Sequence, residues 1–165
     1  MQKILFLLVF PLLVIGCKKG EKQVADNTDN IALFTFQDMP RKQPINQEAQ
    51  NILNEWQEFK DLESSFEVFD RAGNNEDLIL AIDDLLEKEK ALGQSAYPET
   101  FDKPQIKSRQ RIFRTFLLKT QASLADQTDV NEPIKQMLGA NNALRKQFNV
   151  LVNNKLDIEL ILNEK

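Results

Sequence analysis

Large apolar side chains recur every three or four residues along most of this chain, and that spacing is the feature that most constrains its fold. In the stretch 44–70 the spacing runs unbroken through Ile45, Ala49, Ile52, Trp56, Phe59, Leu62, Phe66 and Phe69. Because an α-helix has about 3.6 residues per turn, these side chains fall on one face, which a helix buries against its neighbours. The spacing therefore predicts one continuous amphipathic helix over residues 44–70.

The same spacing in three further stretches predicts helices over residues 75–92, 103–125 and 131–162. Asn74 or Asn75 is expected to cap the first of these, Asp102 is expected to cap the second, and Gly93 is expected to end the first. The links are short and glycine is scarce, with 5 residues in 165, which favours helices over strands. We therefore predict an all-α fold, an antiparallel up-down four-helix bundle over residues 44–165, which follows a flexible N-terminal tether.

A polar segment precedes the expected helices. Residues 18–30 mix both charges without periodicity, which is typical of a flexible spacer, and we expect the tether to cover residues 17–43. Within it, Phe34 and Phe36 are apolar and costly to expose, so we expect both to dock on the helical domain. The alternative is that they contact the membrane or a partner.

The first 17 residues carry a targeting signal. Lys3 precedes the 12-residue apolar stretch Ile4–Ile15, which is broken only by Pro11. This is the length of a signal-peptide core and is too short for a membrane-spanning helix, which needs about 20 residues. The run that follows, Val14-Ile15-Gly16-Cys17, resembles the lipobox of bacterial lipoproteins.

That resemblance implies that residues 1–16 are removed as a signal peptide and that Cys17 is lipid-modified on its thiol and acylated on its new amine. Several acyl chains anchor a protein stably, whereas one does not. The alternative is an ordinary or uncleaved signal peptide with a cysteine there by chance. Lys18 is not the aspartate that retains many lipoproteins at the inner membrane. The expected location is therefore the bacterial cell envelope, at the outer membrane.

The composition excludes several classes of chemistry. The chain has no histidine, which excludes Ser-His-Asp and Cys-His catalysis and imidazole metal sites. The one cysteine, Cys17, belongs to the lipobox, so no disulfide forms within the chain and no catalytic thiol remains. The net charge of −4 argues against a nucleic-acid partner. We predict no cofactor, no metal ion and no catalytic residue.

Charge is distributed unevenly among the expected helices. Residues 75–92 hold six acids and two bases, whereas residues 103–124 hold six bases and no acid. These opposite charges favour pairing of the two helices. Lys107, Arg111 and Arg114 lie three or four apart and form one basic ridge, a candidate site for phosphate, lipopolysaccharide or anionic lipid headgroups. The alternative is a basic helix balanced by its acidic neighbours.

Polar residues at apolar-stripe positions form a second group of candidates. Arg109 lies between Ile106 and Phe113, and Thr120 and Asn141 occupy similar positions in their helices. Buried polar groups are costly unless they are paired, so these three side chains are candidates to line a ligand pocket inside the bundle. The alternatives are that they set helix register or lie at the rim of the core, and that Arg109 pairs with an acid.

The resemblance to lipoproteins does not extend beyond residue 17. Two carboxylates form a third candidate group. Asp83 and Glu87 lie four apart on one face and could share a hard cation. The chain has no histidine to complete the di-metal site of a four-helix bundle, so the pair is interpreted as a solvated acidic face. The predicted role is a non-catalytic protein-interaction or scaffold module that is anchored to the membrane and contacts an envelope protein. The alternative is a small-ligand carrier or sensor with its pocket inside the bundle. A filled core with an exposed apolar groove would favour the first role, and an internal cavity the second.

Overall fold

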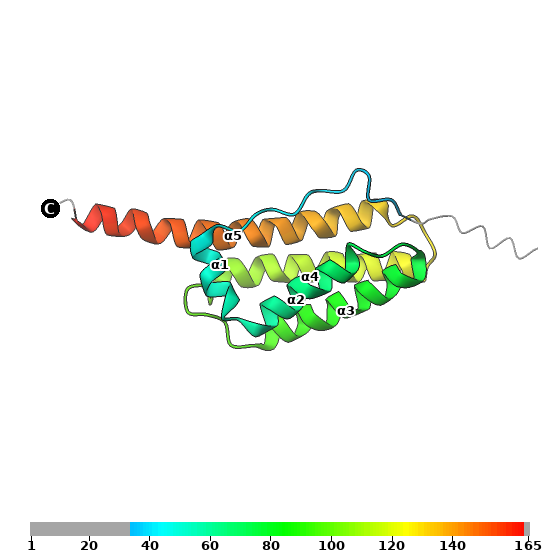
Figure 1. The fold of residues 1–165 in the computed structure, drawn as a ribbon, viewed down its shortest axis with the longest axis horizontal. Helices are drawn as coiled ribbons and strands as arrows, with labels where there is room; N and C mark the ends of the chain where they lie inside the picture. The colour runs from blue at the N-terminus through cyan, green and yellow to red at the C-terminus, as the bar shows by residue number, and fades with distance from the viewer. Residues whose placement is uncertain (1–33, 164–165) are drawn as a thin grey trace, which may run out of the picture. The chain divides into compact units, whose positions relative to one another are not determined.

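The computed structural model describes the backbone of residues 34–163 and the side chains of residues 34–154. These residues form five α-helices and no strand, which confirms the predicted all-α class (Figure 1). The helices are α1 (Gln47–Asn54), α2 (Gln57–Phe69), α3 (Asn75–Gln94), α4 (Pro104–Ala125) and α5 (Asn131–Asn163). The lipobox, Cys17 and residues 18–33 of the expected tether lie outside the described residues.

Helix ends follow local sequence signals in most places. The Asn74 side chain accepts a hydrogen bond from the Asp77 amide at 2.8 Å and caps α3, as predicted. Asp102 does not cap α4, because Lys103 occupies the N-cap position without a side-chain bond, and the Asp102 carboxylate pairs with Lys107 instead. Helix α3 also continues through Gly93 rather than ending there.

The predicted continuous helix over residues 44–70 is wrong, because the chain breaks between α1 and α2. Trp56 separates the two helices with an extended backbone, φ −98° and ψ 98°. Its indole is buried, and Nε1 donates a hydrogen bond to Ser95 Oγ at 2.8 Å. The break lets α1 contact α5 while α2 packs on α3. The apolar spacing continues across the break, so the spacing alone does not reveal it.

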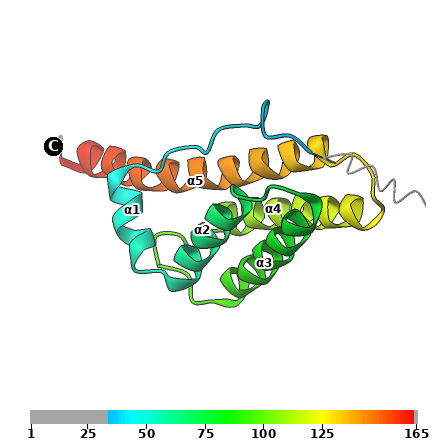
Figure 2. The same ribbon diagram turned by 45° about the vertical axis from the view of Figure 1, so that its right-hand side comes forward.

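Consecutive helices pack side by side: α2 contacts α3, α3 contacts α4, and α4 contacts α5 (Figures 1 and 2). The expected pairing of the acidic and basic helices is therefore confirmed for α3 and α4. Arg114 on α4 and Glu89 on α3 form an ion pair across this contact, with Nη1 and Oε2 2.6 Å apart. No helix in the described part of the chain has the length and apolarity needed to span a membrane.

Aromatic rings fill the core, as the helical spacing predicts. Phe66 of α2 stacks on Phe113 of α4 with ring centroids 5.8 Å apart, and Phe59 of α2 meets Phe148 of α5 edge to face at 5.5 Å. Phe101, in the link between α3 and α4, also packs against Phe148. Every buried side-chain nitrogen and oxygen of the described residues has a hydrogen-bond partner. The core is thus packed with aromatic rings, and its buried polar groups are satisfied.

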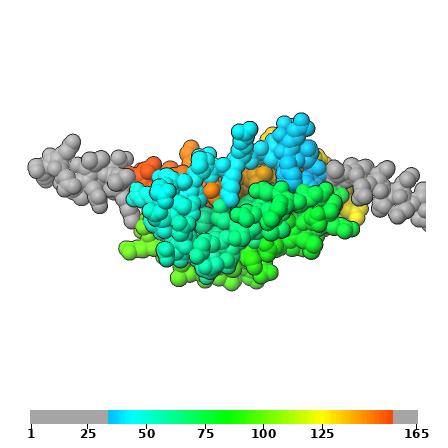
Figure 3. Space-filling view, viewed as in Figure 1, coloured from blue at the N-terminus to red at the C-terminus, as the bar shows by residue number. Residues whose placement is uncertain are grey.

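The segment 34–46, which we call the strap, lies along α5 (Figures 1 and 3). Asn142 Oδ1 accepts a hydrogen bond from the Gln43 amide at 2.7 Å, and Arg145 Nε donates to the Gln43 carbonyl at 2.6 Å. Asn149 Nδ2 donates to the Pro44 carbonyl at 3.0 Å. Side chains of α5 therefore hold the strap by its backbone.

The strap also carries the two phenylalanines expected to dock on the domain. Phe34 is 8% exposed, and Phe36 meets Phe69 of α2 edge to face with ring centroids 5.5 Å apart. Their docking on the helices is confirmed. Residues 34–43, which were assigned to the tether, are therefore packed against the helical domain.

Candidate functional site

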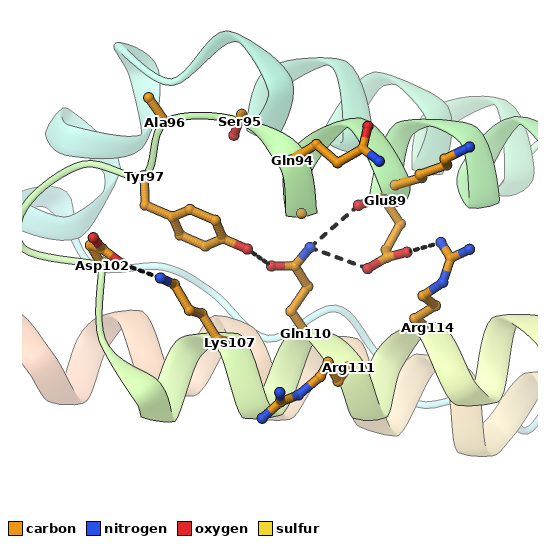
Figure 4. A pocket seen from close by; sticks show the side chains of 12 residues that line it. Glu89, Gln94, Ser95, Ala96, Tyr97, Asp102, Lys107, Gln110, Arg111 and Arg114 are labelled. Carbon is orange, nitrogen blue, oxygen red and sulfur yellow. Dashed lines mark hydrogen bonds and ion pairs between the residues drawn. The ribbon is translucent and has the colours of Figure 1, made fainter.

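The structure brings the three residues of the predicted basic ridge to one surface groove. Lys107, Arg111 and Arg114 of α4 line it together with Glu89 and Lys90 of α3 and with Tyr97 of the link that joins the two helices (Figure 4). We call this hollow the basic groove. Its volume is about 750 Å³, and it is open to solvent.

A chain of polar side chains runs across the basic groove between the two helices (Figure 4). Tyr97 Oη donates a hydrogen bond to Gln110 Oε1, and Gln110 Nε2 donates to Glu89 Oε1 at 3.1 Å. The other carboxylate oxygen of Glu89 accepts from Arg114 Nη1 at 2.6 Å. Gln110 and Glu89 are each 3% exposed. Their buried polar atoms are therefore mutually satisfied, and this fixes the floor of the groove.

Gly93 permits the close approach of Gln110 to α3. A Cβ added at Gly93 would lie 2.9 Å from Gln110 Nε2, too close for an ordinary contact. Gln110 Nε2 is already held by the Glu89 carboxylate and by the Glu89 carbonyl. A side chain at position 93 would therefore displace a group that is fixed on two sides.

Tyr97 forms one end of the groove. Its ring centroid lies 4.8 Å from that of Trp56, and Lys107 Nζ lies 5.2 Å from it on a ring face. Burial raises the pKa of the Tyr97 hydroxyl above its usual value, and the Glu89 carboxylate raises it further. The hydroxyl therefore stays protonated near neutral pH and serves as a hydrogen-bond donor.

The charges of the basic groove are only partly paired. Lys107 Nζ lies 2.5 Å from the Asp102 carboxylate, and Arg114 is paired with Glu89. Among the side chains that the structure describes, Lys90 and Arg111 have no hydrogen-bond or ion-pair partner. The groove thus carries a positive excess and is suited to bind an anion.

The three polar residues predicted to line an internal pocket, Arg109, Thr120 and Asn141, do not share one site. Arg109 is exposed and lines a separate hollow with Ile112, and the buried stripe position belongs to its neighbour Gln110. Thr120 is fully buried, and its hydroxyl donates to the Phe116 carbonyl at 2.9 Å within the same helix.

Asn141 is also buried, at 3% exposure, so Arg109 shares no buried site with Thr120 and Asn141. Gln110 was missed at the sequence level, although it lies seven residues before Leu117 and fourteen before Leu124, at the same position of the helical repeat.

A second surface feature is aliphatic. Four exposed side chains on neighbouring helices, which we call the aliphatic surface, are Val68 of α2, Ile79 and Leu80 of α3, and Leu118 of α4. Leu80 is 69% exposed. Ile79 and Leu118 line a hollow of about 350 Å³ between α3 and α4, and Val68 and Leu80 line a smaller one of about 230 Å³.

Carboxylates border both hollows of the aliphatic surface. Asp83 lines the larger hollow and accepts a hydrogen bond from Gln121 at 2.7 Å. Asp77 lines the smaller one together with Arg71. Within residues 34–154, no three histidine, cysteine, aspartate or glutamate side chains are placed to hold a metal ion. Asp83 and Glu87 are both exposed, in keeping with their interpretation as a solvated acidic face.

Comparison with known proteins finds no family model that matches this chain, no similar curated protein and no similar solved structure.

Proposed function

We propose that this chain is a lipid-anchored lipoprotein of the bacterial cell envelope, at the outer membrane, and that it acts without catalysis as a protein-interaction module. The lipobox-like run that ends at Cys17 supports the anchor. We further propose that α2 to α5 form an antiparallel up-down bundle, which the contacts between consecutive helices support.

The observation that carries the interaction role is the aliphatic surface over a filled core. An exposed aliphatic group on three neighbouring helices is typical of a contact site on a soluble domain. The core holds phenylalanine rings where a carrier would need a cavity, and the buried polar groups are bonded to one another. These features favour a partner bound on the outside over a ligand enclosed in the bundle.

The charge around the aliphatic surface defines the chemistry of the partner. Asp77 and Asp83 border its two hollows, and the exposed carboxylate of Glu87 lies one turn beyond Asp83 on α3. Arg71 lines the smaller hollow beside Asp77, so the negative excess lies at the larger hollow. A segment that runs from Leu80 over Ile79 therefore meets the Asp83 carboxylate. We expect an envelope protein that presents an apolar segment flanked by lysine or arginine.

The interaction is tested by placing a photo-crosslinking side chain at Leu80 in the tagged, lipidated protein in its own host. We expect one envelope protein to be captured from Leu80 and lost in the Asp83→Lys variant, because the reversed charge repels a basic segment. Val150 is exposed on α5, away from the aliphatic surface, and is the matched control position. Equal capture of the same proteins from both positions would contradict the proposed role.

The anchor is tested independently by feeding the host an alkyne-labelled fatty acid. The wild-type protein is expected to take up the label and the Cys17→Ser variant is not, because serine lacks the thiol that is modified. An unlabelled wild-type protein, or equal label on the wild type and the Cys17→Ser variant, would contradict lipidation at this position, whatever the crosslinking experiment finds.

A further inference from the structure

The two acids that line the basic groove already form ion pairs with neighbouring bases. Glu89 is held by Arg114 and Gln110, and Asp102 is held by Lys107. Four bases and two acids line the groove, so its bases exceed its acids by two. The two bases left over belong to Lys90 on one wall and Arg111 on the other.

The groove is held in shape without a ligand. Gln110 joins Tyr97 to Glu89, and Gly93 lets Gln110 lie against α3. Because these contacts are made within the protein, binding does not have to order the floor of the groove. Preformed sites of this kind lose less conformational entropy when a ligand binds.

An apolar hollow adjoins the groove at Tyr97. It has a volume of about 580 Å³ and is lined mainly by apolar side chains, Ile52, Trp56, Ala96, Tyr97 and Pro98, with Asn51 and Glu55 beside them. A ligand that reaches from one hollow to the other would meet bases at one end and aromatic and aliphatic side chains at the other.

We propose that the basic groove binds a phosphate monoester that carries an apolar or aromatic group. A phosphate monoester has a charge of about −2 near pH 7, which matches the excess of two bases. Its several oxygens accept hydrogen bonds from the cations that line the groove, and the planar guanidinium of Arg111 suits two of them at once. The organic group lies against Tyr97, in the adjoining hollow. This site is separate from the aliphatic surface, and its test does not depend on the interaction role.

Trp56 reports on the site, because it is the chain's one tryptophan and its ring centroid lies 4.8 Å from that of Tyr97. The full-length protein in a neutral detergent is titrated with phenyl phosphate while tryptophan fluorescence is followed. We expect a saturable change. The variants Arg111→Gln and Lys90→Gln should each bind about tenfold more weakly or worse, because each loses a charge-assisted hydrogen bond.

Arg109→Gln is the matched control, since it removes the same charge from the same helix outside the groove. Its affinity for phenyl phosphate is expected to equal that of the wild type. Two results would overturn the proposal: no saturable change in the wild-type protein, or an Arg109→Gln variant that weakens as much as Arg111→Gln. The latter would mean attraction by net charge alone.

The source of the phosphate is decided by a second titration with detergent micelles that contain either phosphatidic acid or phosphatidylcholine. A fluorescence change with phosphatidic acid that disappears in Arg111→Gln identifies a lipid headgroup as the ligand. Binding of phenyl phosphate without a response to phosphatidic acid identifies a soluble phosphate ester. Either result supports the phosphate monoester site.

Discussion

Glu89 is a carboxylate that folding removes from water, with its side chain 4% exposed. A buried charge is costly unless it is paired and hydrogen-bonded, and Glu89 meets both conditions through Arg114 and Gln110. The Arg114 side chain is 37% exposed, so water reaches this end of the pair. A single carboxylate thus joins α3 to α4 at the floor of the basic groove.

The variant Glu89→Gln tests this tie. It removes the charge opposite Arg114 and is expected to lower the free energy of unfolding by about 1–2 kcal/mol. The loss is no larger because the partly exposed Arg114 side chain can still be hydrated. Glu87→Gln, two residues away but with its side chain 76% exposed, is the control and should change stability by less than about 0.5 kcal/mol. Urea unfolding followed by circular dichroism measures both. Equal effects would show that the Glu89 pair contributes nothing specific.

Two helical glycines make a second test at this scale. An added Cβ meets nothing within 4 Å at Gly139 in α5, whereas at Gly93 it meets Gln110 Nε2 at 2.9 Å. Gly139→Ala is therefore expected to raise the free energy of unfolding by about 0.5–1 kcal/mol, the usual gain for alanine in a helix. Gly93→Ala should bring no such gain, because Gln110 must give up its fixed position. Thermal unfolding of the two variants distinguishes these outcomes, and an equal gain would contradict the close approach.

At the scale of elements, one face of α5 packs in the core and another face binds the strap. Its apolar face joins the core through residues such as Phe148, and a polar face bonds to the backbone of the strap through Asn142, Arg145 and Asn149. Arg145 also pairs with Glu63 of α2 at 2.6 Å. The strap is therefore an integral part of the packed domain, even though it has no helix or strand of its own.

Asn142→Ala tests how the strap is held. The change removes two bonds, one from the Gln43 amide and one to the Arg41 carbonyl. We expect amide hydrogen exchange in residues 35–46 to become about 5- to 30-fold faster, equivalent to roughly 1–2 kcal/mol, while exchange in α3 and α4 stays unchanged. Asn54→Ala removes an asparagine that bonds only within α1, to Gln50, and serves as the control. Uniform acceleration throughout the protein would mean that the strap does not open separately.

At the scale of the whole molecule, acidic and basic helices face each other, and some carboxylates are left where they are unfavourable. Asp70, at the end of α2, is one of them. Partial burial raises the pKa of the Asp70 carboxyl above its usual 3.8, Lys42 lowers it, and Glu63 and Glu67 raise it again. The end of a helix also disfavours a negative charge.

The pH dependence of stability follows from that shift. Because the folded-state pKa of Asp70 lies above the unfolded value of 3.8, its contribution to stability is complete below that pH and is lost as the pH rises through the folded-state pKa. Asp70→Asn stays neutral, so near pH 7 it should be more stable than the wild type by about 0.5 kcal/mol or less. Near pH 3 the two should be equal.

Urea unfolding at both pH values measures this difference. Glu76→Gln removes a carboxylate from the first turn of α3, the positive end of a helix, and should lose stability near pH 7. A loss of stability in Asp70→Asn would show that attraction to Lys42 outweighs burial and repulsion.

The sequence predicts the basic residues of the candidate site but not the side chains that pair with them, and the difference has a physical cause. The spacing of Lys107, Arg111 and Arg114 was enough to place them together on α4, because neighbours on a helix face follow from local geometry alone. Their partners Glu89 and Tyr97 lie on other elements. Nothing in a single stretch of sequence indicates which distant side chain completes a buried pair.

By itself the sequence determined the all-α class and the approximate extents of α3, α4 and α5, because helical periodicity and caps such as Asn74 act over a few residues. The tertiary structure alone decided the break at Trp56, the burial of Gln110 in place of Arg109, and the fastening of the strap to α5. Each of these depends on a partner far along the chain: Ser95 for Trp56, Glu89 for Gln110, and Arg145 for the strap. Contacts of that kind are formed only when the helices pack.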